Sequence, residues 1–308
     1  MTKRDVAAAS VAERYEPLDA VLGPSDQRYF GAGYRDVAYD VSGVMLGNTL
    51  RGAGALGYPQ DWSVGTRGGP RTPHLSSVDA VVLPVMLLEK CMPSRELHDL
   101  FISSIELRAG SRAWEKLEEV PVHSEISKAG RHLSLRSVAG NIRVRITLTR
   151  HDKSFSAAAA GLSVYGRLFQ STRSDSLIRT DSVDDFLAGR HRMHFGRHRA
   201  ARGVEAFAWP GPTVLDYLVV LGQMTQALVY TSAGVTRSTA GPLWMRTMRV
   251  ERSTPPGPED EFDSVARVVR DRLLVRSGQR VHDVQVSAST TTGVNAVSAL
   301  AYVEDEAG

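Results

Sequence analysis

SSVDAVVLPVMLLEK, from Ser76 to Lys90, and TVLDYLVVLGQMTQA, from Thr213 to Ala227, repeat one helical pattern. Aligned without gaps, they place Asp79 over Asp216, and in each segment a hydroxyl residue stands three positions before the aspartate. That spacing is typical of a capping box at the start of a helix. Each segment continues with apolar residues on nearly every side, as a fully buried helix does. The two stretches therefore predict a duplicated fold with two matched, buried helices.

Size and composition indicate a globular protein that can bury a sizeable core. The chain has 308 residues, of which 42% are hydrophobic and 23% are charged, which is typical of globular domains. Lysine and arginine outnumber aspartate and glutamate by 37 to 34, and the resulting net charge of +3 is too small to imply a nucleic acid. We expect one large domain or two of ordinary size, and no nucleic-acid partner.

Cysteine content and hydropathy predict the cellular compartment of the protein. The single cysteine, Cys91, excludes an internal disulfide and fits a reducing cytoplasm, with the thiol serving as inert packing. Residues 1–17 lack the apolar core of a signal peptide. No run of about 18 apolar residues is present to span a membrane. The sequence predicts a soluble, cytoplasmic protein without a membrane partner.

Strand-like runs such as IRVRITLTR and VNAVSALAYVED follow each predicted helix. The connections between these runs are too short for helical crossovers, so the strands should pair antiparallel. Helix followed by strands, occurring twice, predicts an α+β fold: a tandem double hotdog with two buried central helices, each wrapped by an antiparallel sheet. The predicted units are an N-terminal lead-in over 1–21, a first hotdog unit over 22–170, a basic connecting segment over 171–208 and a second hotdog unit over 209–308.

A glycine-rich stretch from Gly47 to Gly69 is predicted to be a long loop that faces the substrate. Its GAGALG segment, from Gly52 to Gly57, matches a dinucleotide-binding fingerprint, but Tyr58 and Pro59 stand where the helix of that fold should run. The chain contains no Walker A sequence, no metal-ligand spacing of cysteine and histidine, and no GxSxG nucleophile elbow. We therefore predict neither a dinucleotide fold nor a metal site.

Three acids on the predicted helices are candidate catalytic groups. Asp79 and Asp216 lie where burial and the helix dipole can shift a carboxyl pKa, although each could serve only as a cap. Glu89 lies more than two turns into its helix, where a charge has no capping role. A charge buried there costs on the order of several kcal/mol unless it is paired or functional. Pairing with Lys90 or with an arginine of a covering strand is the alternative.

Two glutamines and a histidine complete the predicted chemistry. Gln223 and Gln226 occupy the matching stripe of the second helix, where a buried amide can donate to a carbonyl oxygen or an oxyanion. His74, five residues before Asp79, is a candidate general base, and a structural or merely exposed histidine is the alternative. The first half would supply acid–base groups, and the second half would polarise the substrate carbonyl.

A basic cluster extends from Arg190 to Arg202. It is a candidate site for a phosphate, for the phosphopantetheine of a carrier protein, or for the acidic surface of that carrier. The alternative is a solvated connection between the two units. Aromatic residues are sparse within the cluster, which argues against nucleic acid. The residues predicted to bind a carrier or phosphate are Arg190, Arg192, Arg197 and Arg199.

LGPSDQRYFGAGY, from Leu22 to Tyr34, and LWMRTMRV, from Leu243 to Val250, resemble the AvrD family of avirulence protein D-like enzymes. The resemblance covers nearly the whole chain from about residue 20 onward. It implies an enzyme that joins a β-ketoacyl thioester to a small ketose, xylulose-like or a triose, giving a β-ketoacyl ester that leads to a butenolide or syringolide-like signal. A-factor synthases, which also look like double-hotdog proteins, are associated with the same chemistry. Within the second motif, Trp244 and Arg246 are predicted to bind substrate.

Two shorter segments are similar to hotdog dehydratases. His74-x4-Asp79 is similar to the HPxxLLD segment of polyketide dehydratases, and WPGPTVLD, ending at Asp216, to the FPGxxxxE segment of fatty-acid dehydratases. In those families the histidine and the helix acid are catalytic, a role that the resemblance carries to His74, Asp79 and Asp216. The proline after the histidine is missing, the second half has no histidine, and Pro84 interrupts the first helix. The resemblance therefore favours a thioester-handling cleft over a dehydratase reaction.

We predict an acyltransferase. Glu89, Asp79 or His74 would deprotonate the sugar hydroxyl as it attacks the thioester carbonyl. Gln223, Gln226 or a backbone N–H at a helix start would stabilise the oxyanion. No metal or redox cofactor is required, because the acyl donor is carried on the phosphopantetheine of an acyl carrier protein or of CoA. The alternatives are a hotdog thioesterase or dehydratase, and a non-catalytic protein that binds an acyl or butenolide ligand; an oligomer is compatible with each.

Overall fold

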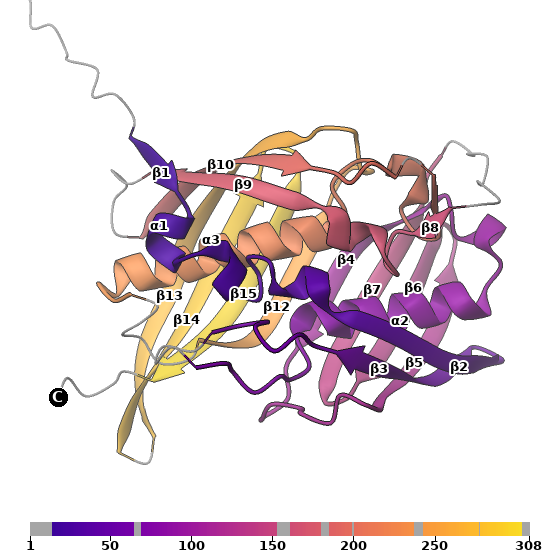
Figure 1. Ribbon diagram of the computed structural model, residues 1–308, viewed down its shortest axis with the longest axis horizontal. Coiled ribbons are helices and arrows are strands. Elements are labelled where there is room, and N and C mark those ends of the chain that lie inside the picture. The colour runs from indigo at the N-terminus through magenta and orange to yellow at the C-terminus, as the bar shows by residue number, and fades with distance from the viewer. Residues whose placement is uncertain are drawn as a thin grey trace, which may run out of the picture.

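Two long helices lie against one face of a broad, curved sheet (Figure 1). The computed structural model describes residues 14–64, 69–152, 161–179, 185–198, 200–236, 243–276 and 278–303. Within these ranges, no helix is both long enough and apolar enough to cross a membrane. The helices are α1 (Asp19–Leu22), α2 (Ser77–Cys91) and α3 (Val214–Ser232).

Both predicted capping boxes are confirmed. The Ser76 hydroxyl accepts a hydrogen bond from the Asp79 N–H, and the Asp79 carboxylate accepts one from the Ser76 N–H; Thr213 and Asp216 make the same pair at the start of α3. Buried side chains cover every side of both helices through most of their length. An amide at the end of such a helix has no water to bind, so the cap supplies the missing acceptor.

Twelve longer strands follow the duplication, six in each half. In the first half they are β2 (Ala38–Leu46), β3 (Thr49–Gly57), β4 (Leu100–Arg108), β5 (Val120–Ala129), β6 (His132–Ala139) and β7 (Ile142–Arg150). In the second half they are β9 (Arg173–Arg179), β10 (Phe186–His194), β12 (Trp244–Arg252), β13 (Glu261–Arg276), β14 (Gln279–Thr290) and β15 (Val294–Val303). The short strands are β1 (Tyr15–Pro17), β8 (Leu162–Ser163) and β11 (Ala201–Arg202).

Thirteen of the described strands form one large sheet with the same strand order in each half, and β8 and β11 pair parallel in a separate two-stranded sheet. The full order is β1-β9-β10-β13-β14-β15-β12-β4-β7-β6-β5-β3-β2, and neighbours in it pair antiparallel, as predicted. From the centre outward, the first half runs β4-β7-β6-β5-β3-β2 and the second runs β12-β15-β14-β13-β10-β9. The two orders match when α2 is laid on α3. The halves join where β4 pairs with β12, with Ile105 opposite Val250.

Alternation along the strands places apolar side chains toward the helices. In β7, Ile142, Val144, Ile146 and Leu148 are buried, and the arginines between them are exposed. Because successive side chains of a strand point to opposite faces, one face of the sheet packs on the helices and the other faces solvent.

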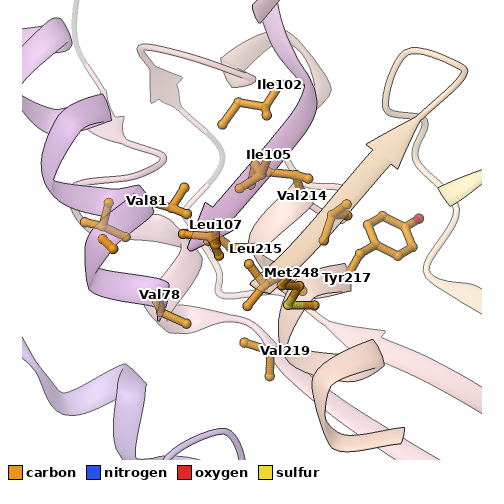
Figure 2. Packing of buried hydrophobic residues seen from close by; sticks show 14 of the residues in the cluster. Val78, Val81, Ile102, Ile105, Leu107, Val214, Leu215, Tyr217, Val219 and Met248 are labelled. Carbon is orange, nitrogen blue, oxygen red and sulfur yellow. The ribbon is translucent and has the colours of Figure 1, made fainter. Parts of the chain in front are cut away.

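The two halves share one core (Figure 2). Val78 from α2 and Leu215 and Val219 from α3 approach Leu107 of β4 and Met248 of β12. All five side chains are buried. Because these residues of both halves are buried together at the junction of β4 and β12, the two halves pack in one continuous hydrophobic core.

The glycine-rich stretch departs from the predicted substrate-facing loop. Residues 49–57 are strand β3, paired with β2 and β5, and residues 65–68 lie outside the described ranges. A Cβ on Gly54 would come within 2.4 Å of the Leu83 side chain of α2, and a Cβ on Gly52 within 2.1 Å of the Ser42 carbonyl oxygen. The glycines therefore permit the close approach of α2 to the sheet.

The predicted basic connecting segment contains two strands of the sheet. β9 and β10 pair with each other, and β10 pairs with β13. Alternation in β10 buries His191 and Met193 and exposes Arg190 and Arg192. The density of exposed basic residues concealed this two-residue period in the sequence.

Replacing Gly52 by alanine should destabilise the protein by about 1–3 kcal/mol, because the new methyl group must displace backbone. Chemical denaturation would measure the loss. Gly57→Ala is the matched control in the same strand, since its Cβ would lie 3.4 Å from the Ala38 side chain, an ordinary contact. Equal unfolding midpoints for the two variants would contradict the packing role of Gly52.

Candidate active site

A cavity of about 230 Å³ lies between the start of α2 and the middle of α3. Ser76 and Ser77 line it from the start of α2, and Thr225 and Gln226 line it from α3. Both halves of the duplication therefore contribute to one cavity. Its further contributors include Trp62 and His74 from the segment before α2, and Trp114 and Trp244 from segments adjoining the sheet.

Asp79 is fully buried behind this cavity, in a cage of phenols. Its carboxylate accepts hydrogen bonds from the Tyr39 hydroxyl at 2.6 Å and the Tyr29 hydroxyl at 3.2 Å, and from the Tyr58 hydroxyl. The Ser76 N–H adds a fourth at 2.8 Å. Burial and the nearby Asp79 charge raise the pKa of all three tyrosines well above its usual range. The phenols consequently stay protonated and act as donors to the carboxylate.

Tyr29 and Ser76 connect the buried carboxylate to the cavity. Both residues line the cavity, their hydroxyl groups are hydrogen-bonded to each other, and Tyr29 also donates to Asp79. The Tyr29 ring lies 5.5 Å from that of Trp62, edge to face, which fixes its orientation. Asp79 itself is not among the lining residues. Its influence on a ligand therefore passes through these two hydroxyl groups.

The sequence alone did not predict that three tyrosines surround Asp79. Tyr29, Tyr39 and Tyr58 come from three separate segments that converge only when β2 and β3 pair beneath α2. The aromatic density of the segment from Leu22 to Tyr34 was the available signal, and it does not reveal which tyrosines meet Asp79.

The cavity lining is cationic. Among the described residues, Arg28, Arg71 and Arg112 contribute to it, and no carboxylate does. Arg28 is buried, and its guanidinium donates to the Gln223 side-chain oxygen at 2.6 Å and to Asp19 at 2.5 Å. A lining with this balance favours a ligand with negative charge or with several acceptor oxygens.

The predicted residues of the second half divide between the cavity and other surroundings. Gln226 and Trp244 line the cavity, whereas Gln223 lies behind Arg28, which donates to it. Asp216 is buried in its capping box, away from the cavity, and burial raises its pKa to about 7. Arg246 is exposed and pairs with Asp283 at 2.9 Å.

Glu89 lies at the far end of α2, in a second cavity of about 520 Å³. Its carboxylate accepts hydrogen bonds from the Ser163 hydroxyl at 2.5 Å and the Val204 N–H at 2.9 Å. Gly203 has a φ of 87°, and a Cβ there would meet the carboxylate at 2.1 Å. Burial raises the pKa of Glu89 to about 7. The structure thus separates Glu89 from Asp79 and His74 and makes it an anchor for the segment between β8 and α3.

A buried ion pair, which the sequence did not reveal, closes the start of α3. Glu205 and Arg252 approach to 3.4 Å with both side chains almost inaccessible to solvent. Glu205 also accepts from the Tyr165 hydroxyl at 2.7 Å and from the Ile102 N–H at 3.1 Å. Burial raises the pKa of Glu205. Where the start of α2 has an open cavity, the start of α3 is therefore filled by a hydrogen-bonded network.

The charges of the predicted basic cluster are largely compensated. Arg192 pairs with Glu261, His194 pairs with Asp175 at 2.8 Å, and Arg190 lies 4.2 Å above the ring of Tyr15. Arg197 is exposed, and Arg199 lies outside the described residues.

Comparison with known proteins assigns the family. The model of the Pseudomonas avirulence D protein (AvrD) family matches residues 13–302. The chain belongs to the AvrD family. The match spans both halves of the duplication and confirms the resemblance seen in the sequence. No curated protein matches the chain.

Several solved structures are similar in shape to this AvrD-family protein. They include the tesB protein of Mycobacterium avium subs paratuberculosis (TM-score 0.47, 10% identity, covering 86% of this chain and 96% of that one). A conserved protein of unknown function with a hot dog fold from Alicyclobacillus acidocaldarius gives a TM-score of 0.44 at 12% identity, covering 90% and 98%. The dehydratase domain from the CurJ module of curacin polyketide synthase gives 0.38 at 6% identity, covering 86% and 96%. Because the identities and TM-scores are low, these likenesses support no statement about activity.

The two matched aspartates should respond differently to replacement by asparagine. Asp79 uses both carboxylate oxygens as acceptors, whereas Asp216 accepts its bonds from Thr213 on one oxygen. At position 79 the NH2 group of asparagine would face hydrogen-bond donors. At position 216 the asparagine carbonyl oxygen can replace the one carboxylate oxygen that accepts hydrogen bonds. Asp79→Asn should cost about 1–3 kcal/mol more unfolding free energy than Asp216→Asn, measured by denaturant titration. Similar losses in the two variants would exclude a special role for the phenol cage.

The raised pKa of Glu89 makes stability depend on pH. The unfolded chain releases this proton near pH 4.3, but the folded protein holds it until about pH 7. The contribution of Glu89 to the free energy of unfolding is therefore fully present below about pH 4. It decreases by roughly 2–3 kcal/mol as the pH rises to about 7. The difference in unfolding free energy between wild type and Glu89→Gln should follow that curve. Glu118→Gln, at an exposed glutamate, is the control, and a flat difference for Glu89→Gln would refute the assignment.

Proposed function

We propose that this protein is an acyltransferase that joins a β-ketoacyl thioester to a small ketose, xylulose-like or a triose, in the cavity at the start of α2. The product would be a β-ketoacyl ester that leads to a butenolide or syringolide-like signal. Membership of the AvrD family supports this reaction class. The observation that carries the proposal is one cavity with a histidine base, the start of a buried helix and an amide side chain, contributed by both halves.

We further propose that each half is a hotdog unit, so that the protein is a tandem double hotdog. Support comes from the topology: both halves place a capped, buried helix between their second and third long strands and repeat the same strand order. In this arrangement the start of one helix faces the side of the other. A cavity at such a junction is a suitable place to hold a thioester.

His74 is the proposed base. Its Nδ1 atom lies 3.1 Å from the carbonyl oxygen of Thr72, and a carbonyl can only accept, so Nδ1 carries the proton. The Nε2 atom is then free to take a proton. The ring of His74 packs edge to face on Trp62, with 5.4 Å between centroids, which holds the imidazole at the cavity wall.

The reaction then follows from the positions of these groups. The ketose hydroxyl attacks the thioester carbonyl as Nε2 of His74 accepts its proton; the new C–O bond forms, the C–S bond breaks, and the proton passes to the departing thiolate. The capping box uses the amides of Ser76 and Asp79, whereas the amide of Ser77, which lines the cavity, has no acceptor within the helix. Gln226 donates from the opposite wall. Together they stabilise the tetrahedral oxyanion. The step needs neither a metal nor a redox cofactor, and the acyl group arrives on a carrier protein or CoA.

Three other functions remain as rivals. A thioesterase would use water in place of the ketose hydroxyl at the same cavity, and a dehydratase would need an acid there. Asp79 and Asp216 are both held in capping boxes, which disfavours dehydration and is the observation that supports a non-catalytic binder of acyl or butenolide ligands. The cationic, hydroxyl-rich lining favours catalysis on a polyol over simple storage of an acyl chain.

Mass spectrometry of products tests the proposal. The purified protein is incubated with a β-ketoacyl-CoA and a panel of ketoses, and a mass corresponding to the β-ketoacyl ester is expected. Free β-keto acid as the sole product would indicate a thioesterase. Saturable thioester binding without any product would indicate a binder.

His74→Ala should lower the rate of ester formation by about 10²–10⁴-fold, because it removes the proton acceptor. Gln226→Ala should lower kcat by about 10²-fold with little change in KM, because its donor acts on the oxyanion. His132→Ala, at an exposed histidine on β6, is the matched control. Wild-type rates in both cavity variants would remove these residues from the mechanism.

A further inference from the structure

The solvent face of the first half of the sheet carries a concentrated positive charge. The pairing register places six exposed arginines in two adjacent rows across its strands and the adjoining strand β12 of the second half. We call this surface the arginine face; its members are Arg51, Arg108, Arg136, Arg143, Arg145 and Arg249. Two glutamates, Glu106 and Glu125, lie among them. Most of these residues border a shallow hollow of about 890 Å³.

The register sets arginine directly against arginine. Arg143 of β7 lies opposite Arg108 of β4, and Arg136 of β6 lies opposite Arg145 of β7. Like charges directly opposite on neighbouring strands repel and weaken a sheet. In one row the repulsion is partly offset, because Glu125 lies opposite Arg136 and Arg145 approaches Glu106 to 3.8 Å. Arg249 pairs with Glu251 at 2.5 Å. In the other row, within the described part of the chain, Arg108 and Arg143 face each other and form no ion pair. A surface that keeps such repulsion is better explained by an anionic partner than by the fold.

This arrangement differs from that of the basic cluster predicted in the sequence. There Arg192 has Glu261 as a partner, and Arg190 is stacked on Tyr15. The facing pair of Arg108 and Arg143 therefore lies on the opposite half of the sheet from the cluster that the sequence indicated.

The strands that carry the arginine face lead along the chain to residues that line the proposed active site. Directly after Arg108, β4 continues into Ala109 and Gly110, which line the cavity, and Arg112 follows at its rim. Asn141, which also lines the cavity, leads into β7 two residues before Arg143. A partner seated on this face would therefore be positioned to pass a tethered group into the cavity.

We propose that the arginine face docks an acidic carrier protein, which presents its acyl group at the cavity mouth. An acidic protein surface fits better than a nucleic acid. The glutamates within the face would repel a continuous phosphate backbone, and His123 is the one aromatic side chain for base stacking among the described residues of the hollow. Exposed Val138 and Val297 on its borders offer the apolar contacts usual in a protein interface. The identity of the acyl group rests on the proposed acyl transfer, whereas the docking surface is inferred from the positions of the arginines alone.

Direct binding tests the docking surface. The probe is a bacterial acyl carrier protein with a fluorophore on its phosphopantetheine thiol, titrated with the full-length protein and followed by anisotropy at about 50 mM salt. Arg143→Glu should raise Kd by about tenfold, and Arg108→Glu combined with Arg143→Glu should raise it further. Raising the salt to about 300 mM should weaken binding by the wild type far more than by the double variant.

Two controls separate docking from folding and from general charge. Arg143→Glu turns a repulsive pair with Arg108 into an attractive one, so its melting temperature should equal or exceed that of the wild type. Arg173→Glu makes the same charge change at an exposed position of β9 and should leave Kd within about twofold. Loss of binding together with unimpaired stability in Arg143→Glu is the expected result.

Several outcomes would overturn the proposal. They are the absence of saturable carrier binding by the wild type, equal losses in Arg143→Glu and Arg173→Glu, and a loss confined to Arg190→Glu. A labelled single-stranded oligonucleotide that binds more tightly than the carrier and is released by Arg143→Glu would identify the face as a nucleic-acid site instead. Ester formation from the CoA thioester bypasses the carrier, so that measurement can fail or succeed independently of docking.

Discussion

The structure depends on sealing the polar start of a helix that is buried on all sides. The first amides of α2 need acceptors, and Asp79 with Ser76 supplies them. That solution buries a carboxylate, which then needs donors of its own, and Tyr29, Tyr39 and Tyr58 supply these. The three tyrosines fix the segment before β2, the strand β2 and the end of β3 around the helix. One satisfied charge thus organises the wall of the cavity.

The duplicated halves share a plan and differ in how they treat this constraint. At α3 the matching Asp216 accepts from Thr213 alone, and burial raises its pKa to about 7. The space beside it is filled by the Glu205–Arg252 pair and Tyr165. One of the two matching junctions therefore contains a cavity and the other a buried network. Functional asymmetry arises from what packs around two similar helices.

Charge is distributed by the same logic. On the second half of the sheet, Arg192 pairs with Glu261 and Arg190 lies above the ring of Tyr15. On the first half, Arg143 and Arg108 face each other. A net charge of +3 for the whole chain conceals this difference, because pairing depends on strand register. The cationic cavity and the arginine face adjoin, which is consistent with an enzyme that receives an anionic or carrier-borne substrate at one edge of its sheet.

Hydroxyl–aspartate spacing and apolar periodicity are local properties of the sequence. They were therefore sufficient to predict the two buried helices, their caps and the antiparallel strands. The sequence also indicated His74, Gln226 and Trp244, which the structure brings to one cavity. Only the tertiary structure separated Glu89 from Asp79, enclosed Asp79 with tyrosines and joined Glu205 to Arg252, because each of these depends on contacts between distant segments. It also turned the glycine-rich stretch into strand β3, since close packing against α2 demands glycine as strongly as a loop does. Local spacing fixes how a helix begins, whereas the partners of its polar groups are fixed only when the sheet closes over it.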